Sequence, residues 1–279
     1  MLDAAVVHRR EMKLTLWISM FIIGLCTLVA IFSPWIMPHD PTEFVTDEPF
    51  GSPQVGIWLG SDYLGRDLFS RLIDGTRTTL VMALAATALA HLLGDTLGLL
   101  AALRGGWVDA VISRVADLIL SLPKIIVGLV VVAALGPSIV VIVILAAIVY
   151  AAGVFRIARA LGSDLVNMDF IKVAKSRGEG TGWILFAEIL PHVAQPLAAD
   201  FAIRMSFAIL FMSSLSFLGL GVQPPLADWG GLVRENLGGL AAGSLVPIFP
   251  AIAIAVTSVA LNLFVDSLDE HQRKQKGTR

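Results

Sequence analysis

Repeated apolar runs, each long enough to cross a bilayer as a helix, constrain this chain more than any other feature of its sequence. The hydrocarbon core of a bilayer takes about 20 helical residues to cross, and a helix satisfies its own backbone groups there. Only 15% of the 279 residues are charged, against roughly a quarter in soluble domains. The sequence therefore predicts an all-α polytopic membrane protein.

Six membrane spans fit the apolar runs. Pro34 is expected to end the first span, and Arg104 with the two glycines after it the second. The third run is amphipathic before Pro123 and apolar after it, so we expect one span that is kinked at this proline. The expected spans are residues 14–32, 78–103, 111–135, 138–158, 192–220 and 247–265.

Basic residues lie mostly on one side of these spans. With both termini in the cytoplasm, the inner segments hold 15 Lys and Arg residues and the outer segments hold four. Because Lys and Arg accumulate in cytoplasmic loops, this split predicts cytoplasmic termini. Residues 1–13 and the basic tail 271–279 are then cytoplasmic, as is the segment 159–191, while 33–77 and 221–246 are periplasmic.

The sequence lacks the common motifs for catalysis and metal binding. Cys26 is the single cysteine, so the chain cannot form an internal disulfide or a thiolate metal site. No Gly-x-x-x-x-Gly-Lys-Ser/Thr loop is present, and no Gly-x-Ser-x-Gly or His-Glu-x-x-His motif. Met205 and Met212 are expected to pack rather than to bind metal. We therefore expect no catalytic residue, metal or cofactor in this chain.

The polar stretch between the fourth and fifth spans has the pattern of two short helices separated by glycines. Gly178, Gly180 and Gly182 interrupt the helical periodicity, and Leu190-Pro191 is expected to start the fifth span, because proline is favoured in a first helical turn. A short helix held across the membrane surface can receive a push from a separate subunit. A solvated basic loop is the alternative that these features leave open.

This stretch resembles the loop of ABC importer permeases whose signature is Glu-Ala-Ala, three residues, Gly, a spacer and Ile-x-Leu-Pro. The last Ala, the Gly and the Leu-Pro are matched here, whereas the Glu-Ala is replaced by Lys172 and Val173. In that family the loop is the coupling helix, which docks on the ATPase subunit. The resemblance implies an ATPase-coupling role for Asp169, Phe170, Ala174, Gly178, Leu190 and Pro191.

Further blocks are similar to the C-type subunit of the dipeptide, oligopeptide and nickel branch of these permeases. The first lies in residues 59–77 and contains Gly-Ser-Asp and Gly-Arg-Asp, and the second lies in residues 216–230 and ends with Trp-Gly. Residues 262–268 echo the C-terminal block of the family. The resemblance implies six transmembrane helices in the type I ABC importer permease fold, over a permease domain of residues 14–270.

The resemblance also implies a working assembly in the bacterial inner membrane. Such a chain forms half of a pathway and pairs with a homologous second permease subunit, two cytoplasmic ATPase subunits that bind ATP and Mg²⁺, and an extracytoplasmic substrate-binding protein. Transport then proceeds by alternating access. Peptides are the first expectation for the solute, with nickel chelates, opines, glutathione-like compounds and sugars left open. No nucleic-acid partner is expected.

Four outer residues are candidates for contact with the binding protein. Asp62, Arg66 and Asp67 are expected to cap and pin a short outer helix before the second span. Trp229 lies just outside a span and suits an interfacial anchor. Stabilisation of a loop that touches no partner is the alternative.

Two charged pairs lie within the predicted spans, where charges are costly and usually face protein or water. Asp200 and Arg204 are four residues apart in the fifth span, so they share a helix face and can pair. His91 and Asp95 repeat this spacing in the second span. All four are candidate pathway or gate residues, and a structural ion pair or interhelical hydrogen bond is the alternative.

Two other classes of protein are compatible with a polytopic chain. A secondary transporter is expected to show inverted repeats and broken helices near the midplane. No internal repeat is visible here, and only the third span is clearly interrupted. An intramembrane enzyme needs a catalytic constellation at bilayer depth, for which only His91 and Asp95 offer a start.

Overall fold

The computed structural model describes the backbone of residues 2–276 and the side chains of residues 14–267. In this part of the chain the regular structure is helical, apart from isolated β-bridges in the segment before α2, so the all-α class is confirmed. The elements are α1 (Leu2–Ile36), α2 (Leu68–Arg104), α3 (Gly106–Ser121), α4 (Lys124–Leu135), α5 (Ile139–Leu165), α6 (Asp169–Ser176), α7 (Thr181–Trp183), the π-helix η1 (Ile184–Ile189), α8 (Leu190–Phe217), α9 (Trp229–Glu235), α10 (Gly238–Ala241) and α11 (Ile248–Lys276).

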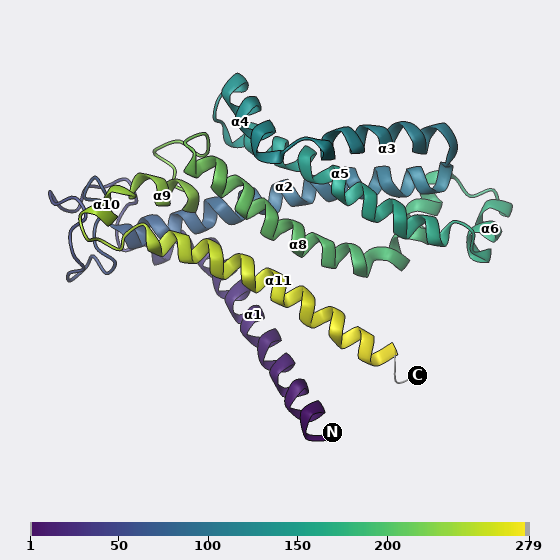
Figure 1. The fold of residues 1–279 in the computed structure, drawn as a ribbon, viewed down its shortest axis with the longest axis horizontal. Coiled ribbons are helices and arrows are strands. Elements are labelled where there is room, and N and C mark those ends of the chain that lie inside the picture. Colours follow the sequence, from purple (N-terminus) through teal and green to yellow (C-terminus); the bar gives the residue numbers. More distant parts are fainter. Residues whose placement is uncertain (1, 277–279) are drawn as a thin grey trace.

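The helices form an elongated bundle around the pair α2 and α5 (Figure 1). α8 packs against both members of this pair, and α3 lies along α5. α6 lies at one end of the bundle, while the segment 37–67, α9 and α10 gather at the other end. The bundle therefore presents two chemically different ends, separated by the length of its long helices.

Small residues allow α2 and α5 to approach closely, as is common between membrane helices. A Cβ atom added to Gly94 would lie 2.6 Å from the Cβ of Val154, and one added to Gly98 would lie 2.7 Å from the carbonyl oxygen of Phe155. Gly162 on α5 faces α2 in the same way. At these positions the two backbones are too close for any side chain larger than hydrogen.

Five helical runs are long and apolar enough to cross a membrane, and α3 with α4 makes a sixth if the bent pair is one span. Each of the six predicted spans falls on one of these runs. Several helices extend beyond the predicted ends, because polar and amphipathic turns continue the helical backbone outside the apolar core, whereas α8 ends at Phe217, before the predicted residue 220. The sixth predicted span, for example, ends at residue 265, whereas α11 continues to Lys276.

The third span is broken rather than kinked. α3 ends at Ser121, α4 begins at Lys124, and the two axes differ by 89°. Between them, Leu122 has extended backbone (ψ 138°), because a residue that precedes proline is sterically driven out of the helical region. The predicted interruption at Pro123 is confirmed, but the expected single kinked helix is corrected to two helices at nearly a right angle.

The first helix does not stop at the proline that was expected to end it. α1 continues through Pro34 to Ile36. Proline has no N–H to donate to the carbonyl of Ala30, and the hydroxyl of Ser33 donates to that oxygen instead (3.3 Å). The helix therefore keeps this carbonyl satisfied for its last turn.

The second span begins earlier than residue 78, because a side chain caps it. Asp67 is the N-cap of α2, and its carboxylate accepts hydrogen bonds from the backbone N–H (3.1 Å) and the hydroxyl (2.6 Å) of Ser70. The expected short outer helix before this span is absent from the described residues. Asp67 caps the spanning helix itself.

Between α5 and α8 the chain makes one non-helical turn before α6 and another after it. After α6, Gly178 adopts a left-handed backbone (φ +81°), which glycine tolerates best, so the predicted glycine break is confirmed there. From Thr181 the helical backbone then runs to Phe217 without interruption. Pro191 lies in the first turn of α8, as predicted, although the helical backbone enters α8 from η1 without a break. It follows directly on η1, whose wider π-type turn lies just before Pro191. Proline has no N–H to donate, so the backbone hydrogen-bond pattern is interrupted at this position.

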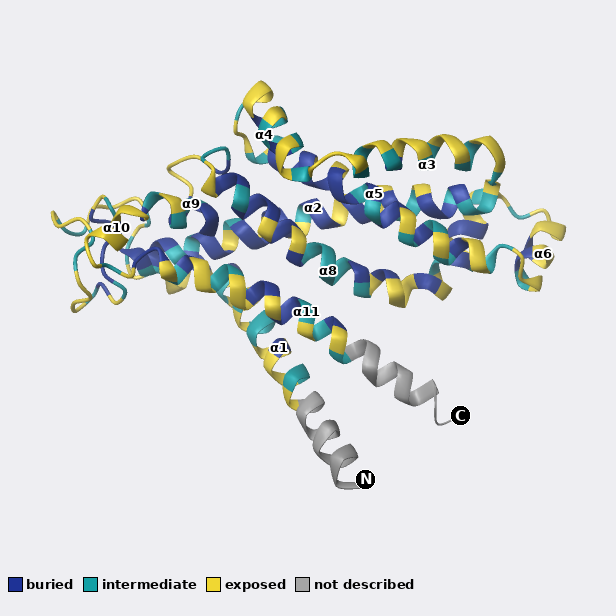
Figure 2. Cartoon of the chain, in the orientation of Figure 1, coloured by how far each residue is buried: buried dark blue, intermediate teal, exposed yellow. Residues whose placement is uncertain are grey.

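α1 packs mainly on α11 and leaves most of its apolar surface uncovered (Figure 2). The residues Trp17, Phe21 and Trp35 are 68%, 70% and 77% exposed. An uncovered apolar face of this kind suits lipid or another membrane subunit. The basic residues predicted for the two cytoplasmic ends, within 9–13 and 271–279, lie outside the described side chains.

The α2–α5 contact predicts an unusual response to a single methyl group. Gly94→Ala should destabilise the permease by about 1–3 kcal/mol, because the new methyl overlaps Val154. Gly24→Ala is the matched control, since a Cβ there meets no atom within 4 Å and alanine favours the helix. Melting temperatures of both variants in detergent check the prediction, and equal stability of Gly94→Ala and wild type would contradict it.

Candidate functional site

α6 is held on the bundle by one buried face. Ile171 and Ala174 are 0% and 1% exposed and belong to a hydrophobic cluster with Ile189 of η1. Phe170 stacks on His192 of α8, with ring centroids 4.8 Å apart. The short helix therefore cannot shift without acting on the start of α8.

The opposite face of α6 is open. Asp169 and Lys172 pair at 2.9 Å with side chains that are 94% and 64% exposed, and Val173 is 55% exposed. The six predicted coupling residues thus divide by position. Phe170, Ala174 and Leu190 pack against the bundle, Gly178 makes the turn, and Asp169 and Pro191 are exposed.

The two charged pairs predicted within the spans both form, and they meet. Arg204 Nε lies 3.2 Å from Asp200 Oδ1, and His91 Nδ1 lies 3.1 Å from Asp95 Oδ2. His91 Nε2 lies 3.7 Å from Asp200 Oδ2, so this histidine links the pair on α2 to the pair on α8. The four candidate pathway residues are therefore one cluster rather than two separate pairs.

A cavity of about 340 Å³ lies beside this cluster, between α2, η1 and α8. Both His91 and Asp95 line it. His91 Nε2 and Asp95 Oδ1 are buried and have no hydrogen-bond partner among the described residues. The cluster beside this cavity thus retains polar atoms without a hydrogen-bond partner.

Arg204 also reaches toward α5 and the broken span. A Cβ added to Gly153 of α5 would lie 2.7 Å from Arg204 Nη1, so this glycine makes room for the guanidinium group. Nearby, Lys124 Nζ lies 4.7 Å from the ring centroid of Tyr150, whose hydroxyl donates to the carbonyl of Phe207 (2.9 Å). Polar groups from α2, α4, α5 and α8 therefore converge inside the bundle.

The charged candidates of the outer segments are buried. Asp62 accepts hydrogen bonds from Arg66 Nε (2.7 Å) and Arg71 Nη1 (2.6 Å), and Arg71 also donates to Glu235 of α9 (2.8 Å). The side chains of Asp62, Arg66 and Asp67 are 0%, 7% and 1% exposed. In this conformation they shape the end of the bundle formed by the segment 37–67, α9 and α10, and their charged groups are not available for direct contact with another protein.

Trp229 is buried as well, which corrects its expected role as an interfacial anchor. It is 1% exposed, its backbone N–H donates to Thr79 Oγ1 (3.1 Å), and its indole N–H donates to the carbonyl of Leu72 (3.4 Å). Both partners are on α2. The ring therefore fastens α9 to the spanning helix instead of facing the bilayer surface.

Comparison with known proteins identifies the family of this chain. Residues 94–276 match the family described as "Binding-protein-dependent transport system inner membrane component". Residues 15–52 match the "N-terminal TM domain of oligopeptide transport permease C". The chain belongs to this family of binding-protein-dependent transport permeases. The resemblance to C-type peptide permeases that the sequence blocks indicated is confirmed.

Curated relatives match most of the permease. The glutathione transport system permease protein GsiD of Pectobacterium atrosepticum is 35% identical over 241 residues, which cover 86% of this chain and 80% of the relative. The probable D,D-dipeptide transport system permease protein DdpC of Escherichia coli is 34% identical over 250 residues (90% and 84%). The di/tripeptide transport system permease protein DppC of Pseudomonas aeruginosa is 35% identical over 255 residues (89% and 83%).

These matches decide the class of the protein. The chain is a membrane-spanning permease subunit of an ABC importer and resides in the inner membrane. The secondary-transporter interpretation is therefore set aside.

Sequence reasoning missed several residues of the permease interior. Lys124 carries a usable indication, because a lysine inside an apolar run is rare and usually functional. Gly153 and Tyr150 carried none, since their roles depend on how α5 lies against α8. The ion pair between Arg71 and Glu235 could not be predicted either, because these residues are separated by 164 positions in the sequence.

Removing one charge of the Asp200–Arg204 pair should be more damaging than removing both. Asp200→Asn leaves a poorly exposed guanidinium without its carboxylate, and Arg204→Gln leaves the carboxylate alone. Breaking a buried pair in this way costs about 3 kcal/mol or more, whereas the double variant buries no unpaired charge. Membrane content of folded permease and transport by the whole importer are the measurements. A double variant as inactive as the singles would show that transport needs the charges themselves.

Asp228 gives the α9 end of the bundle a pH dependence. Its carboxylate is buried and caps α9 by accepting from the backbone N–H groups of Gly230 (3.2 Å) and Gly231 (3.3 Å). Burial raises the pKa of this carboxyl from 3.8 to about 6, although hydrogen bonds from Ser216 and the two amides act in the opposite direction. Because the folded-state pKa lies above the unfolded value, the stabilisation is complete below about pH 4 and is lost as pH rises through 6, by about 3 kcal/mol.

Asp228→Asn should remove this dependence, because the amide still accepts a capping hydrogen bond but cannot ionise. The melting temperature of the wild-type permease should fall between pH 5 and pH 8, at about the range of the shifted pKa, and that of the variant should stay nearly level. Asp40→Asn is the control, since Asp40 is exposed and its pKa is lowered by hydrogen bonds from Thr42. Parallel pH curves for wild type and Asp228→Asn would refute this assignment.

Proposed function

We propose that this permease forms half of an inward pathway for peptides, including peptide-like solutes such as glutathione. A homologous second permease completes the pathway, and an extracytoplasmic binding protein delivers the solute. Two cytoplasmic ATPase subunits bind ATP and Mg²⁺ and hydrolyse the nucleotide. The names of the curated relatives, which refer to glutathione, D,D-dipeptides and di- or tripeptides, support this choice of solute.

The α6 end of the bundle is proposed to face the cytoplasm, together with both termini. The excess of Lys and Arg in the segments assigned to this side supports the orientation. The opposite end, formed by the segment 37–67 with α9 and α10, then receives the binding protein (Figure 1). The buried charged residues at this end would stabilise the conformation of the surface that the binding protein contacts.

The observation that carries the proposal is the two-faced packing of α6. Its outer face, with Asp169 and Val173, is open for an ATPase subunit, and its inner face is fixed to η1 through Ile171. The helical backbone is continuous from Thr181 to Phe217, so a displacement of α6 passes into the helix that carries Asp200. This is the contiguous physical link that mechanical coupling requires.

Alternating access follows from this link. When the ATPase subunits close on ATP, they move α6, and the two permease halves open outward to accept the solute. Hydrolysis then lets α6 return and the pathway opens inward. In this scheme the chain supplies no catalytic group, and its work is to convert the movement of α6 into a rearrangement of the spanning helices.

A charge on the open face of α6 tests the coupling role. Val173→Asp should leave the permease folded, because this side chain is 55% exposed. It should lower retention of the ATPase subunits about tenfold or more, since a new unpaired charge would be buried at the interface. Purification of the tagged importer and ATPase activity stimulated by loaded binding protein are the measurements.

Two variants control this experiment. Ser163→Asp adds the same charge at an exposed position of α5 and should leave both readouts unchanged. Ala174→Asp places the charge on the buried face and should reduce folded permease instead. Normal coupling in Val173→Asp, or the absence of ATPase subunits from wild-type preparations, would overturn the proposed function.

A further inference from the structure

We propose that Lys124 is a binding point for the carboxylate of the transported solute at the middle of the membrane. The inference rests on the proposed function, because it requires that the chain lines a pathway for a peptide-like solute. It assigns to this lysine a direct contact with the cargo. Peptides with a free C-terminal carboxylate and an apolar last side chain are the solutes that this site would suit.

The depth of Lys124 is the first observation. Its ammonium group lies over the ring of Tyr150, which is 11 positions after the start of α5 at Ile139. At 1.5 Å per residue this places the contact about 16 Å along a spanning helix, close to half of a hydrocarbon core of about 30 Å. Anionic lipid headgroups do not reach that depth, so an anion that meets Lys124 must arrive through the protein.

The second observation is the missing counter-charge. Among the described side chains, Lys124 forms no ion pair with a carboxylate. The charged group that acts on it is Arg204, which has the same sign. A cation at bilayer depth normally has a partner or marks the path of an ion or substrate. Asp200 is already engaged by Arg204, so the partner of Lys124 has to come from elsewhere.

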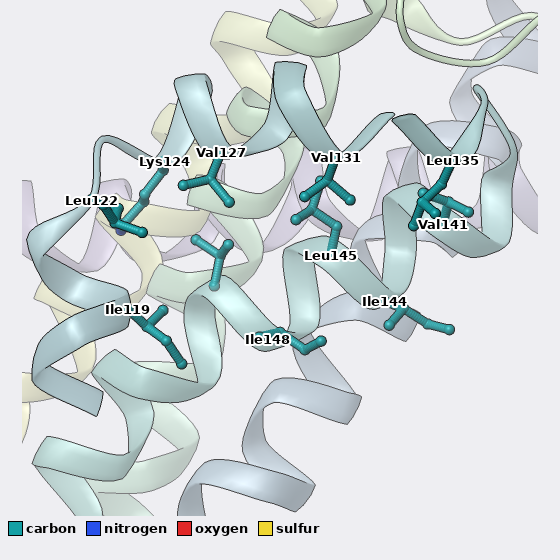
Figure 3. Close-up of a pocket in the computed structure, with 11 residues that line it drawn as sticks. Ile119, Leu122, Lys124, Val127, Val131, Leu135, Val141, Ile144, Leu145 and Ile148 are labelled. Atoms are coloured by element: carbon teal, nitrogen blue, oxygen red, sulfur yellow. The ribbon is translucent and has the colours of Figure 1, made fainter. Parts of the chain in front are cut away.

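The third observation is the cavity that Lys124 borders. It has a volume of about 360 Å³ and lies between α3, α4 and α5, where the 89° break turns α4 away from α3. Lys124 stands toward one end beside Leu122, while Leu135 and Val141 mark the other (Figure 3). Among the described residues, Lys124 is the only charged one that lines it.

The chemistry of the cavity defines the ligand. One cation beside an apolar surface fits a molecule with a single carboxylate and an adjoining apolar group. The guanidinium of Arg204, seated against Gly153 of α5, adds positive potential from the neighbouring helix. The C-terminal residue of a short peptide has both features, whereas a cationic or purely apolar solute would leave the ammonium group unpaired.

Transport of matched probes tests the proposal in the complete importer in proteoliposomes. The probes are alanyl-leucine and its C-terminal amide, with uptake normalised to the affinity of the binding protein for each. Lys124→Met keeps the length of the side chain and removes its charge. We expect uptake of alanyl-leucine to fall about tenfold, uptake of the amide to stay near the wild-type rate, and Lys124→Arg to restore the dipeptide. Equal loss for both probes, or no loss for either, would overturn the proposal.

Thiol labelling supplies a readout that does not depend on the identity of the solute. Cys26→Ser removes the single native cysteine, and Lys124→Cys or Val130→Cys then adds one. Val130 is the control, because it is 63% exposed on α4 and does not line the cavity. We expect an anionic sulfonate reagent to label Lys124→Cys in at least one nucleotide state, and alanyl-leucine to slow that labelling but not the labelling of Val130→Cys. An unlabelled Lys124→Cys in every state would refute a place in the pathway.

Failure of the proposed function would look different. If the wild-type importer shows no ATPase activity stimulated by loaded binding protein, the coupling proposal fails. If the binding protein takes up neither probe, the peptide assignment fails. In both cases the labelling of Lys124→Cys still decides whether this position meets water and anions at mid-membrane.

Discussion

The close approach of α2 and α5 determines where the charged cluster of α2 and α8 can lie. Gly94 meets Val154 across this contact, and the residues next to each of them carry the polar cluster. On α5 the neighbour is Gly153, against which Arg204 rests, and on α2 it is Asp95, paired with His91. A larger residue at the contact would separate the helices at the level where α8 inserts its charges. The charged cluster can therefore form only because glycine at the neighbouring position lets the two helices pack closely.

Burial of charge follows the same rule at both levels of the bundle. A charge removed from water is tolerated only when hydrogen bonds and an opposite charge replace its hydration. At the α9 end of the bundle, Asp62 accepts hydrogen bonds from two arginines as well as from backbone N–H groups, and Glu235 shares the second arginine. Inside the bundle, Asp200 pairs with Arg204 and lies near His91. Lys124 departs from this rule, which is why its position calls for a ligand from outside the chain.

Local sequence patterns predicted those features of the permease that depend on residues close together in the sequence. Apolar runs located the spans, i and i+4 spacing located both charged pairs, and the glycine break after α6 followed from Gly178. Pro123 predicted the place of the broken span but not its angle, because the angle depends on what α4 packs against. Trp229 was misplaced for the same reason, since its partners on α2 are 150 or more residues away in sequence. The charges of Asp62 and Arg66 were recognised, while their burial requires Glu235 from α9.

α8 belongs to both proposed sites, and this gives their combination a physical consequence. Its first turns continue η1 and rest on α6, and its middle carries Arg204. Lys124 begins α4, a separate short helix that packs on α5 and α8 and turns away from α3. A displacement of α8 therefore changes the distance between the guanidinium and the ammonium group, because the break before α4 frees Lys124 from following α3. If α6 drives that displacement, the positive potential at mid-membrane is higher in one nucleotide state than in the other. A carboxylate is then held in the first state and released in the second, so the same helix that receives the push sets the affinity for the cargo.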